Sequence, residues 1–292
     1  MFTSLLVGLD GSSHAEVALA QAILVGQRFR SRIVLAHISP PTGRTSEMSL
    51  GAPWMEWVAG RAPQTRVERE AAAQRMLDDS AGAVRRAGLE VETVHRTGDV
   101  VDELQDLGAL VGVIVVGRVG YRGATAEDEV GPDTRTLLRN APQPVLVCGR
   151  IPTAMDRVLV GYSGSPASEA TLAFAARFAG ISGAHLDVLQ FPGSLGDRGE
   201  LTQRASGALA QAPLDYDLHD GDGPEEEMLL AAARRLGATA VFTETEREHG
   251  HWLVPPAADA ILRASDLPVL VHPEPTLASA RTPSSDRHPA SR

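Results

Sequence analysis

Two segments of this chain occur twice, and this repetition constrains the fold more than any other feature of the sequence. The first segment, Leu5–Ser12 (LLVGLDGS), returns as Val158–Ser165 (VLVGYSGS). The second segment, Leu138–Val147 (LRNAPQPVLV), returns in the same order as Leu262–Val271 (LRASDLPVLV). Two ordered matches of this kind predict two copies of one structural unit, joined end to end.

The copies divide the 292 residues into two domains and a tail. We assign the first domain to residues 1–150 and the second to residues 151–273. Residues 274–292 are rich in Pro, Ser, Thr and Arg and have little apolar surface to bury, so we expect a disordered tail there. The extra length of the first copy falls mainly in residues 39–65, which include Trp54 and Trp57. This insertion is interpreted as a lid, as a surface for another subunit, or as an extension of the next helix.

Each copy alternates short apolar strands with amphipathic helices. This order is typical of right-handed βαβ units and predicts an α/β fold with a parallel sheet in each domain. Ser13 is expected to cap the first helix in a capping box with Glu16, and Ser165 is expected to cap its counterpart ahead of Pro166. The ten expected strands are Ser4–Leu9, Arg32–His37, Glu90–His95, Val113–Val116, Pro144–Cys148, Arg157–Gly161, His185–Gln190, Leu214–His219, Thr239–Thr243 and Val269–His272.

Composition excludes several classes of protein. The chain has no apolar run of about 18 residues or more, so we expect no membrane span, and its first residues do not resemble a secretory signal. The formal net charge of −10 argues against a nucleic-acid partner, because phosphate neutralisation requires a basic face. The single cysteine, Cys148, excludes an intramolecular disulfide framework and favours a reducing cytoplasm.

The candidate ligand site lies at the carboxyl ends of the first domain's strands, where an open parallel sheet binds its ligands. Glycines at this edge let main-chain N–H groups approach phosphate oxygens, and a helix that opens near Asp133 adds its positive end. Asp10 is interpreted either as a ribose acceptor or as a turn residue, and His37 either as an adenine contact or as a satisfied polar cap. The candidate residues are Asp10, Gly11, Ser12, His37, Ile38, Gly117, Arg118, Gly120, Gly131 and Thr134.

These motifs resemble the universal stress protein family. The strand ending in Asp10-Gly11-Ser12 matches the start of the family's domain, Leu138–Val147 matches its end, and the resemblance spans roughly residues 2–273 as two copies. It implies two tandem Rossmann-like domains of the adenine nucleotide alpha hydrolase-like type, each a five-stranded parallel sheet of order 3-2-1-4-5 flanked by helices. It also implies that the halves pair, as an intramolecular pseudo-dimer or in a homodimer, and that the protein acts in a stress response.

The nucleotide loop departs from the family pattern. The ATP-binding branch carries two glycines separated by two residues, then nine residues, then Gly followed by Ser or Thr. Gly117, Gly120 and Gly131 match the glycines, but the second gap has ten residues and Pro132 replaces the hydroxyl residue, with Thr134 two positions later. The resemblance therefore implies ATP with Mg²⁺ as the ligand of a degenerate loop in the first domain.

We expect no nucleotide in the second domain. Ser163 replaces Asp10, and Thr243 and Glu246 are expected to take the places of Gly117 and Gly120. A Cβ atom and a carboxylate would then stand where phosphate oxygens approach the backbone.

We therefore expect a non-catalytic, regulatory stress-response protein of the cytoplasm, with an adenine nucleotide as its partner. One alternative is a scaffold without nucleotide, which binds a protein through Trp54 and Trp57. Another is a slow adenine-nucleotide hydrolase, because enzymes of this topology use S-G-G-x-D-S at the turn that Ser163–Ser165 occupies here, without the second Gly and the Asp. His249 and His251 are too weak a signal for a metal, so no metal ligand or catalytic residue is assigned.

Overall fold

The computed structural model describes residues 2–41, 66–120, 130–191, 198–210, 213–245, 247–248, 251–252 and 256–273. Several sequence-based expectations fall outside these residues. They concern the insertion with Trp54 and Trp57, the acidic part of the nucleotide loop, His249 and the expected disordered tail.

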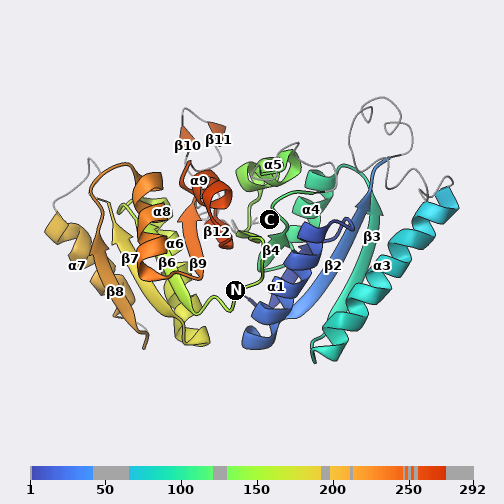
Figure 1. Ribbon diagram of the computed structural model, residues 1–292, viewed down its shortest axis with the longest axis horizontal. Coiled ribbons are helices and arrows are strands. Elements are labelled where there is room, and N and C mark those ends of the chain that lie inside the picture. Colours follow the sequence, from blue (N-terminus) through green and yellow to red (C-terminus); the bar gives the residue numbers. More distant parts are fainter. Residues whose placement is uncertain are drawn as a thin grey trace, which may run out of the picture.

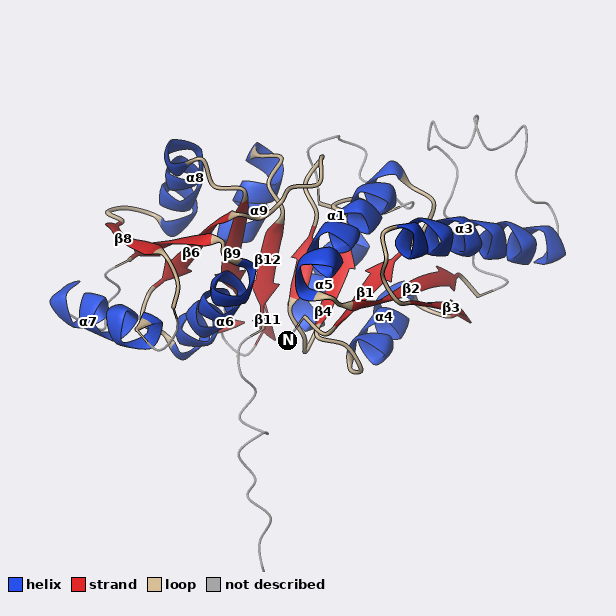
Figure 2. Cartoon of the chain, turned by 90° about the horizontal axis from the view of Figure 1, so that it is seen from below, coloured by secondary structure: helices blue, strands red, loops and turns tan. Residues whose placement is uncertain are grey.

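The protein folds into one mixed sheet of ten strands with helices on both faces (Figures 1 and 2). The strand order is β3-β2-β1-β4-β5-β12-β9-β6-β7-β8. The strands of the first half are β1 (Ser4–Gly8), β2 (Arg32–Ser39), β3 (Val91–Thr97), β4 (Val113–Val116) and β5 (Val145–Val147). Those of the second half are β6 (Arg157–Tyr162), β7 (His185–Gln190), β8 (Tyr216–Asp220), β9 (Ala240–Glu244) and β12 (Val269–His272). Each half thus keeps the order 3-2-1-4-5 of its own strands.

The two halves meet through β5 and β12, which pair antiparallel with Leu146 opposite Leu270. Each half keeps its five expected parallel strands, and the two five-stranded sheets join at this pair into a single mixed sheet. The physical reason lies in β5, an apolar strand of Val145, Leu146 and Val147 that is completely buried. Its outer N–H and C=O groups require a partner, and β12 provides one.

Two apolar clusters fill the two sides of the sheet, because successive strand residues point to opposite faces. One side is covered by α1 (Ser13–Phe29), α3 (Arg66–Arg86), α6 (Pro166–Ser182) and α7 (Arg198–Leu209). The other side is covered by α4 (Val100–Gly108), α5 (Pro132–Asn140), α8 (Glu225–Leu236) and α9 (Pro256–Ala264). None of the described helices has the length and apolar character needed to span a membrane.

Contacts that Phe2, α1 and α6 make across the boundary also hold the halves together. Phe2 packs 4.6 Å from Phe29 and 5.3 Å from both Phe174 and Phe178, measured between ring centroids. Gln21 of α1 donates to the carbonyl of Thr153 at 2.9 Å and accepts from its amide at 2.8 Å. Because these contacts cross the boundary between the copies, each half completes the core of the other.

Two local expectations were wrong by a small shift. Ser12, rather than Ser13, caps α1, because the Ser12 side chain accepts from the amide of Ala15 at 3.2 Å. The strand that was expected from Leu214 begins at Tyr216. A short antiparallel pair, β10 (Arg247–Glu248) and β11 (His251–Trp252), was not expected at all. The cap on α6 is confirmed, since the Ser165 side chain accepts from the amide of Ser168 at 3.0 Å.

Candidate functional site

The candidate site begins with the turn between β1 and α1. Gly11 adopts φ +80°, a left-handed conformation that favours glycine. This turn brings the Asp10 carboxylate back onto Ser12, whose amide and hydroxyl donate to Oδ1 at 3.0 Å and 2.6 Å. Asp10 is therefore a turn residue, as one of its two interpretations proposed.

The second oxygen of Asp10 faces the loop that follows β4. A Cβ atom added to Gly120 would lie 3.1 Å from Asp10 Oδ2, so the glycine backbone and the carboxylate are in close contact. β1 and β4 are neighbours in the sheet, with Leu5 opposite Val113, and this pairing brings the two loops to the same edge. The structure thus brings together Asp10 and Gly120, which are far apart in sequence.

Both ends of the nucleotide loop meet at this edge. The amide of Gly131 donates to the carbonyl of Arg118 at 2.9 Å. A Cβ atom on Gly131 would lie 3.3 Å from the amide nitrogen of Gly120, so only a glycine leaves that stretch of backbone uncovered. Gly120 and Gly131 therefore form one small backbone surface beside Asp10.

Helix α5 starts from this surface with an unusual N-terminus. Gly131 is the N-cap and has no side chain to cap the helix, and Pro132 occupies the first turn. Such an N-terminus has amides and a positive dipole end that suit an anion. Thr134 does not present its hydroxyl there, because Oγ1 donates to the carbonyl of Gly117 at 3.2 Å.

Gly117 has a packing role. A Cβ atom at this position would lie 2.7 Å from the backbone carbonyl group of His14 in the first turn of α1. Only a residue without a side chain allows β4 to end this close to α1. His14, which packs against Gly117, was missed by the sequence reasoning. Burial, followed by the charge of Arg118, lowers the pKa of His14, while the Asp10 charge acts in the opposite direction.

Arg118 points away from the other candidate residues. Its side chain is 1% exposed, and its guanidinium donates to the carbonyl of Leu262 in α9 of the second half. The positive charge of Arg118, which the sequence suggested as a phosphate contact, therefore lies at the junction of the two halves.

His37 and Ile38 are the last residues of β2 before Ser39 and lie beside the same edge. Nδ1 of His37 lies 2.8 Å from the carbonyl of Leu9, which fixes the ring against the end of β1. Burial is the main cause that lowers the pKa of His37. The His95 ring lies 5.3 Å away, and its Nε2 is 2.8 Å from the hydroxyl of Ser39. Ile38 is buried in the core.

The equivalent edge of the second half is built differently. Leu5 pairs with Val113 in the first half, and its repeat equivalent Val158 pairs with Ala240 in the second half. Ala240 is therefore equivalent to Val113, and Glu244, four residues later, takes the place of Gly117. The expected match of Gly117 with Thr243 was wrong by one residue, because the segment between the anchors is shorter and sequence alone does not fix the strand register. Glu244 is buried, with 6% of its surface exposed.

Side chains also fill the turn between β6 and α6. Tyr162 donates its hydroxyl to Glu169 at 2.8 Å, and Arg204 donates to the same carboxylate oxygen at 2.6 Å. Arg204 also donates to the carbonyl of Gly164 at 3.0 Å. Ser163, the counterpart of Asp10, has its hydroxyl 3.3 Å from that of Ser168. The position that faces the loop in the first half is thus occupied by a network of side chains here.

The sequence pattern of the Universal stress protein family matches residues 1–149 and again residues 155–273. A universal stress protein from Mycobacterium tuberculosis is 25% identical over 290 residues, which cover 91% of this chain and 95% of that protein. Universal stress proteins from Synechocystis and Mycolicibacterium smegmatis are 30% and 29% identical, over alignments that span 37% and 65% of their own length.

Solved structures show the same fold. A universal stress protein from Archaeoglobus fulgidus superposes with a TM-score of 0.74 at 18% identity, covering 94% of this chain and all of that one. A protein from Pseudomonas aeruginosa superposes with a TM-score of 0.61 at 19% identity, covering 94% of this chain and 93% of that one.

Proposed function

Because this chain belongs to the universal stress protein family through two consecutive copies of the family domain, we propose that it is a regulatory stress protein that binds an adenine nucleotide in its first half only. The observation that carries the proposal is the close approach of Asp10 to Gly120, with Gly131 packed against Gly120, at the carboxyl edge of the sheet. Asp10 Oδ2 is the acceptor for a ribose hydroxyl, and the glycine surface is the place for the phosphates.

The N-terminus of α5 supports the phosphate part of this proposal. No side chain caps it, and its positive end lies beside the surface of Gly120 and Gly131. Backbone amides of this surface would hold the phosphates, and bound Mg²⁺ would supply the positive charge that Arg118 does not, because its guanidinium is buried against α9. His37, fixed by its contact with Leu9 and with its pKa lowered by burial, is a neutral group for the base to contact.

The chemistry of the edge favours binding over turnover. The Ser12 hydroxyl donates to Asp10 and accepts from the amide of Ala15, and the Thr134 hydroxyl donates to Gly117. Among the described residues of this edge, these two hydroxyls are thus engaged in fixing the backbone. We accordingly assign no catalytic step to this edge.

Calorimetric titration of ATP with Mg²⁺ tests the proposal. Gly120→Val is the variant of choice, because its nearest neighbour is the end of a side chain, whereas a new side chain at Gly117 would strike the backbone of His14. The bulky group should weaken ATP binding by about tenfold or more through lost hydrogen bonds to the backbone. Gly207→Val is the matched control, since Gly207 has open space around its Cβ position, and Glu244→Ala should leave the affinity unchanged.

Three outcomes would contradict parts of the proposal. Unchanged affinity in Gly120→Val would place the nucleotide elsewhere. No heat of binding in the wild-type protein would favour the scaffold alternative. Release of phosphate from ATP that is lost in Ser39→Ala would favour a hydrolase that uses the Ser39–His95 contact.

A further inference from the structure

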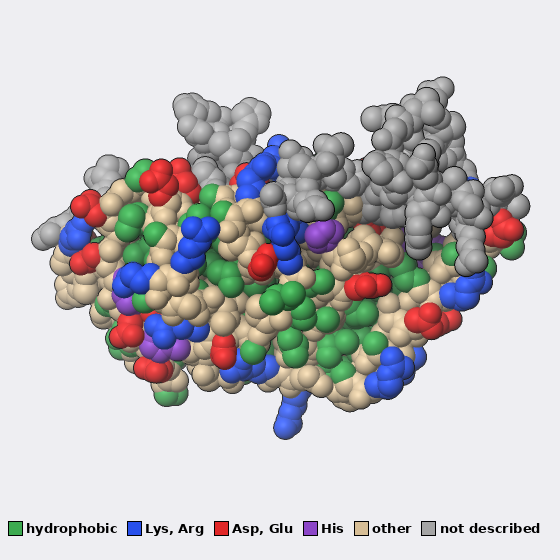
Figure 3. Space-filling model, in the orientation of Figure 1, with side chains coloured by type: hydrophobic (Ala, Val, Ile, Leu, Met, Phe, Trp, Pro, Cys, Tyr) green, Lys and Arg blue, Asp and Glu red, His purple; other side chains and the backbone are tan. Residues whose placement is uncertain are grey.

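A second cluster of ionisable side chains lies far from the proposed nucleotide edge, on one face of β7 and β8. His185 and Asp187 alternate along β7, and Asp217 and His219 alternate along β8, so all four point to the same side of the sheet. Figure 3 shows acidic, basic and histidine side chains gathered at the lower left, where Figure 1 draws these strands. The signal in the sequence is the pair His185-Leu-Asp187 and Asp217-Leu-His219, which the repeat analysis did not use.

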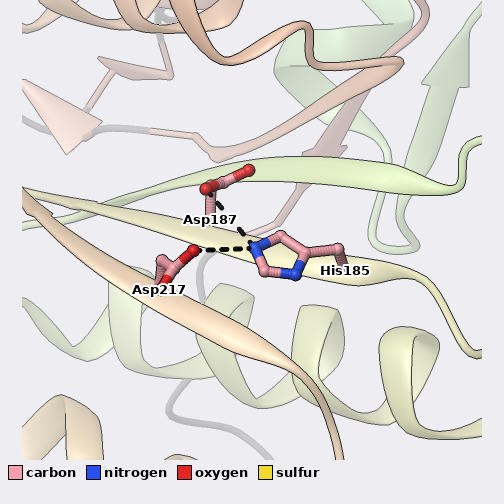
Figure 4. Close-up of side chains that lie close together, drawn as sticks. All are labelled: His185, Asp187 and Asp217. Atoms are coloured by element: carbon pink, nitrogen blue, oxygen red, sulfur yellow. Dashed lines mark ion pairs between the residues drawn. The ribbon is translucent and has the colours of Figure 1, made fainter.

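Nε2 of His185 points between two carboxylates (Figure 4). It lies 3.2 Å from Asp217 Oδ2 and 3.6 Å from Asp187 Oδ1. Neither contact has the geometry of a hydrogen bond, and this buried nitrogen makes none with any described residue. Two ligand atoms bound to a tetrahedral zinc ion at about 2.0–2.1 Å lie about 3.3 Å apart. The two observed separations bracket this spacing, and the three ligand atoms lie within 4.8 Å of one another.

The other ring nitrogen of His185 is held as in metal-ligating histidines. Nδ1 lies 3.0 Å from Asp215 Oδ2, so its N–H donates to a carboxylate. A histidine that binds a metal through one nitrogen usually donates its other N–H to such a group, which fixes the tautomer and the ring orientation. Asp215 therefore leaves the lone pair of Nε2 directed at Asp187 and Asp217.

The charges of the cluster suit a divalent cation. Asp187 is completely buried and receives two hydrogen bonds from Arg157, at 2.7 Å to Oδ2 and 2.9 Å to Oδ1. Three carboxylates (Asp187, Asp215 and Asp217) and one guanidinium leave two negative charges when the histidines are neutral. Asp187 is the buried carboxylate of the three and is already paired with Arg157, whereas Asp215 is exposed, so the excess negative charge attracts a cation mainly from the solvent side. The Asp217 side chain is 61% exposed, which gives an ion a path from solvent.

We propose that His185, Asp187 and Asp217 bind a divalent transition-metal ion of the zinc class, with Asp215 as the residue that orients His185. A nitrogen ligand with carboxylates favours zinc over magnesium or calcium, which prefer oxygen alone. The Nε2–H of His219 donates to Asp187 Oδ1 over 2.7 Å. An ion at that oxygen replaces this contact, and Arg157 keeps Asp187 in place through Oδ2.

The test is calorimetric titration of the untagged, chelator-treated protein with Zn²⁺ alone, followed by Ca²⁺ and Mg²⁺. The wild-type protein should bind Zn²⁺ in preference to the other ions. His185→Ala and Asp217→Asn should each remove this binding, whereas Asp215→Asn should weaken it by about 10- to 100-fold. Asp220→Asn is the matched control, because it changes the same charge on the same strand outside the cluster.

The variants avoid Asp187, because its loss would leave Arg157 without its carboxylate and would endanger the fold. Circular dichroism and the thermal midpoint in the presence of chelator show that each variant folds. Zn²⁺ binding that is equal in the wild type, His185→Ala and Asp217→Asn would overturn the proposal. So would a preference for Ca²⁺ or Mg²⁺, or an absence of Zn²⁺ binding by the folded wild-type protein.

Discussion

At the scale of single residues, several side chains of this protein serve the fold and the proposed site together. Asp10 closes a turn with one oxygen and faces Gly120 with the other. Gly117 lets β4 approach α1, whereas Gly120 and Gly131 leave backbone uncovered at the same edge. The three glycines of one motif therefore have different physical roles, and single substitutions can distinguish the packing role from the binding role.

Gly117→Ala should destabilise the fold much more than Gly120→Ala. The new Cβ atom would lie 2.7 Å from the His14 backbone, which moves only with the first turn of α1. We expect a loss of about 1–3 kcal/mol in the free energy of unfolding, as for overpacked cores. At Gly120 the contact is with a carboxylate oxygen at 3.1 Å, and the loss should stay near about 0.5 kcal/mol. Urea unfolding measures both, and equal losses would contradict the packing role of Gly117.

Partly buried histidines should make the stability depend on pH. Burial, with the charge of Arg177 as a smaller cause, lowers the pKa of His272 below its ordinary value of 6.5, and the Phe174 ring lies 5.2 Å away. Above pH 6.5 the ring is neutral in both the folded and the unfolded protein, so the effect is absent. As the pH falls below that value, the unfolded protein binds a proton that the folded protein does not, and the free energy of unfolding falls.

Urea unfolding at about pH 7.5 and pH 5.5 measures this dependence. His272→Gln should reduce the loss of stability between the two pH values, while His14 and His37, whose pKa values are lowered in the same direction, preserve part of it. A loss as large in His272→Gln as in the wild-type protein would show that His272 does not contribute.

At the scale of helices and strands, the ends of elements decide where the functional groups lie. The first turns of α1 and α6 show this, because their caps occupy equivalent positions in the two repeats. Ser12 and Ser165 have extended backbone conformations, and each accepts from the amide three residues later. The glycine before each serine has a positive φ, +80° at Gly11 and +76° at Gly164. A glycine and a serine together thus define each helix start.

Ser12→Ala should cost about 1 kcal/mol of unfolding free energy, because α1 loses the hydroxyl that caps it and Asp10 loses a hydrogen-bond donor. Ser13→Ala is the natural control, since Ser13 lies inside the helix. Chemical denaturation of both variants distinguishes the observed cap from the one that the capping-box pattern predicted. A larger loss for Ser13→Ala would restore the original prediction.

The sequence predicted the elements better than their ends and registers. Apolar runs bounded by turn residues located all ten strands of the large sheet, because burial imposes that pattern directly. The cap was placed one residue late, since Ser12 and Ser13 both suit a cap and only the Asp10 turn chooses between them. A contact such as that of Arg118 with Leu262 joins distant segments and leaves little trace in a single sequence.

At the scale of the whole molecule, the two repeats behave as the two halves of one sheet. Leu146 and Leu270, which are equivalent residues of the repeats, pair with each other where β5 meets β12. Arg135 of α5 forms an ion pair at 3.0 Å with Asp259, its equivalent in α9. The strands at the junction therefore have approximate two-fold symmetry. The equivalent residues Arg135 and Asp259 have opposite charges, so the charges do not follow this symmetry.

This asymmetry predicts how the first half would behave alone. Residues 1–150 would expose the buried β5 edge, and the free N–H and C=O groups of Val145–Val147 would require a partner. A second copy supplies one, with Leu146 opposite Leu146, so we expect a dimer in sedimentation or light scattering. Two copies of Arg135 would then face each other in place of the Arg135–Asp259 pair. Their repulsion is screened by salt, so the dimer should tighten as ionic strength rises.

The variant Arg135→Gln separates the charge effect from the strand effect. It should strengthen the dimer of residues 1–150 at low salt and remove most of its salt dependence, because the like charges are gone. In the full-length protein the same substitution removes a partly exposed ion pair, and it should cost at most about 1 kcal/mol. A monomeric fragment with a folded spectrum would mean that the β5 edge is satisfied without strand pairing. Covering the β5 edge would then not be the reason why the two repeats are joined in one chain.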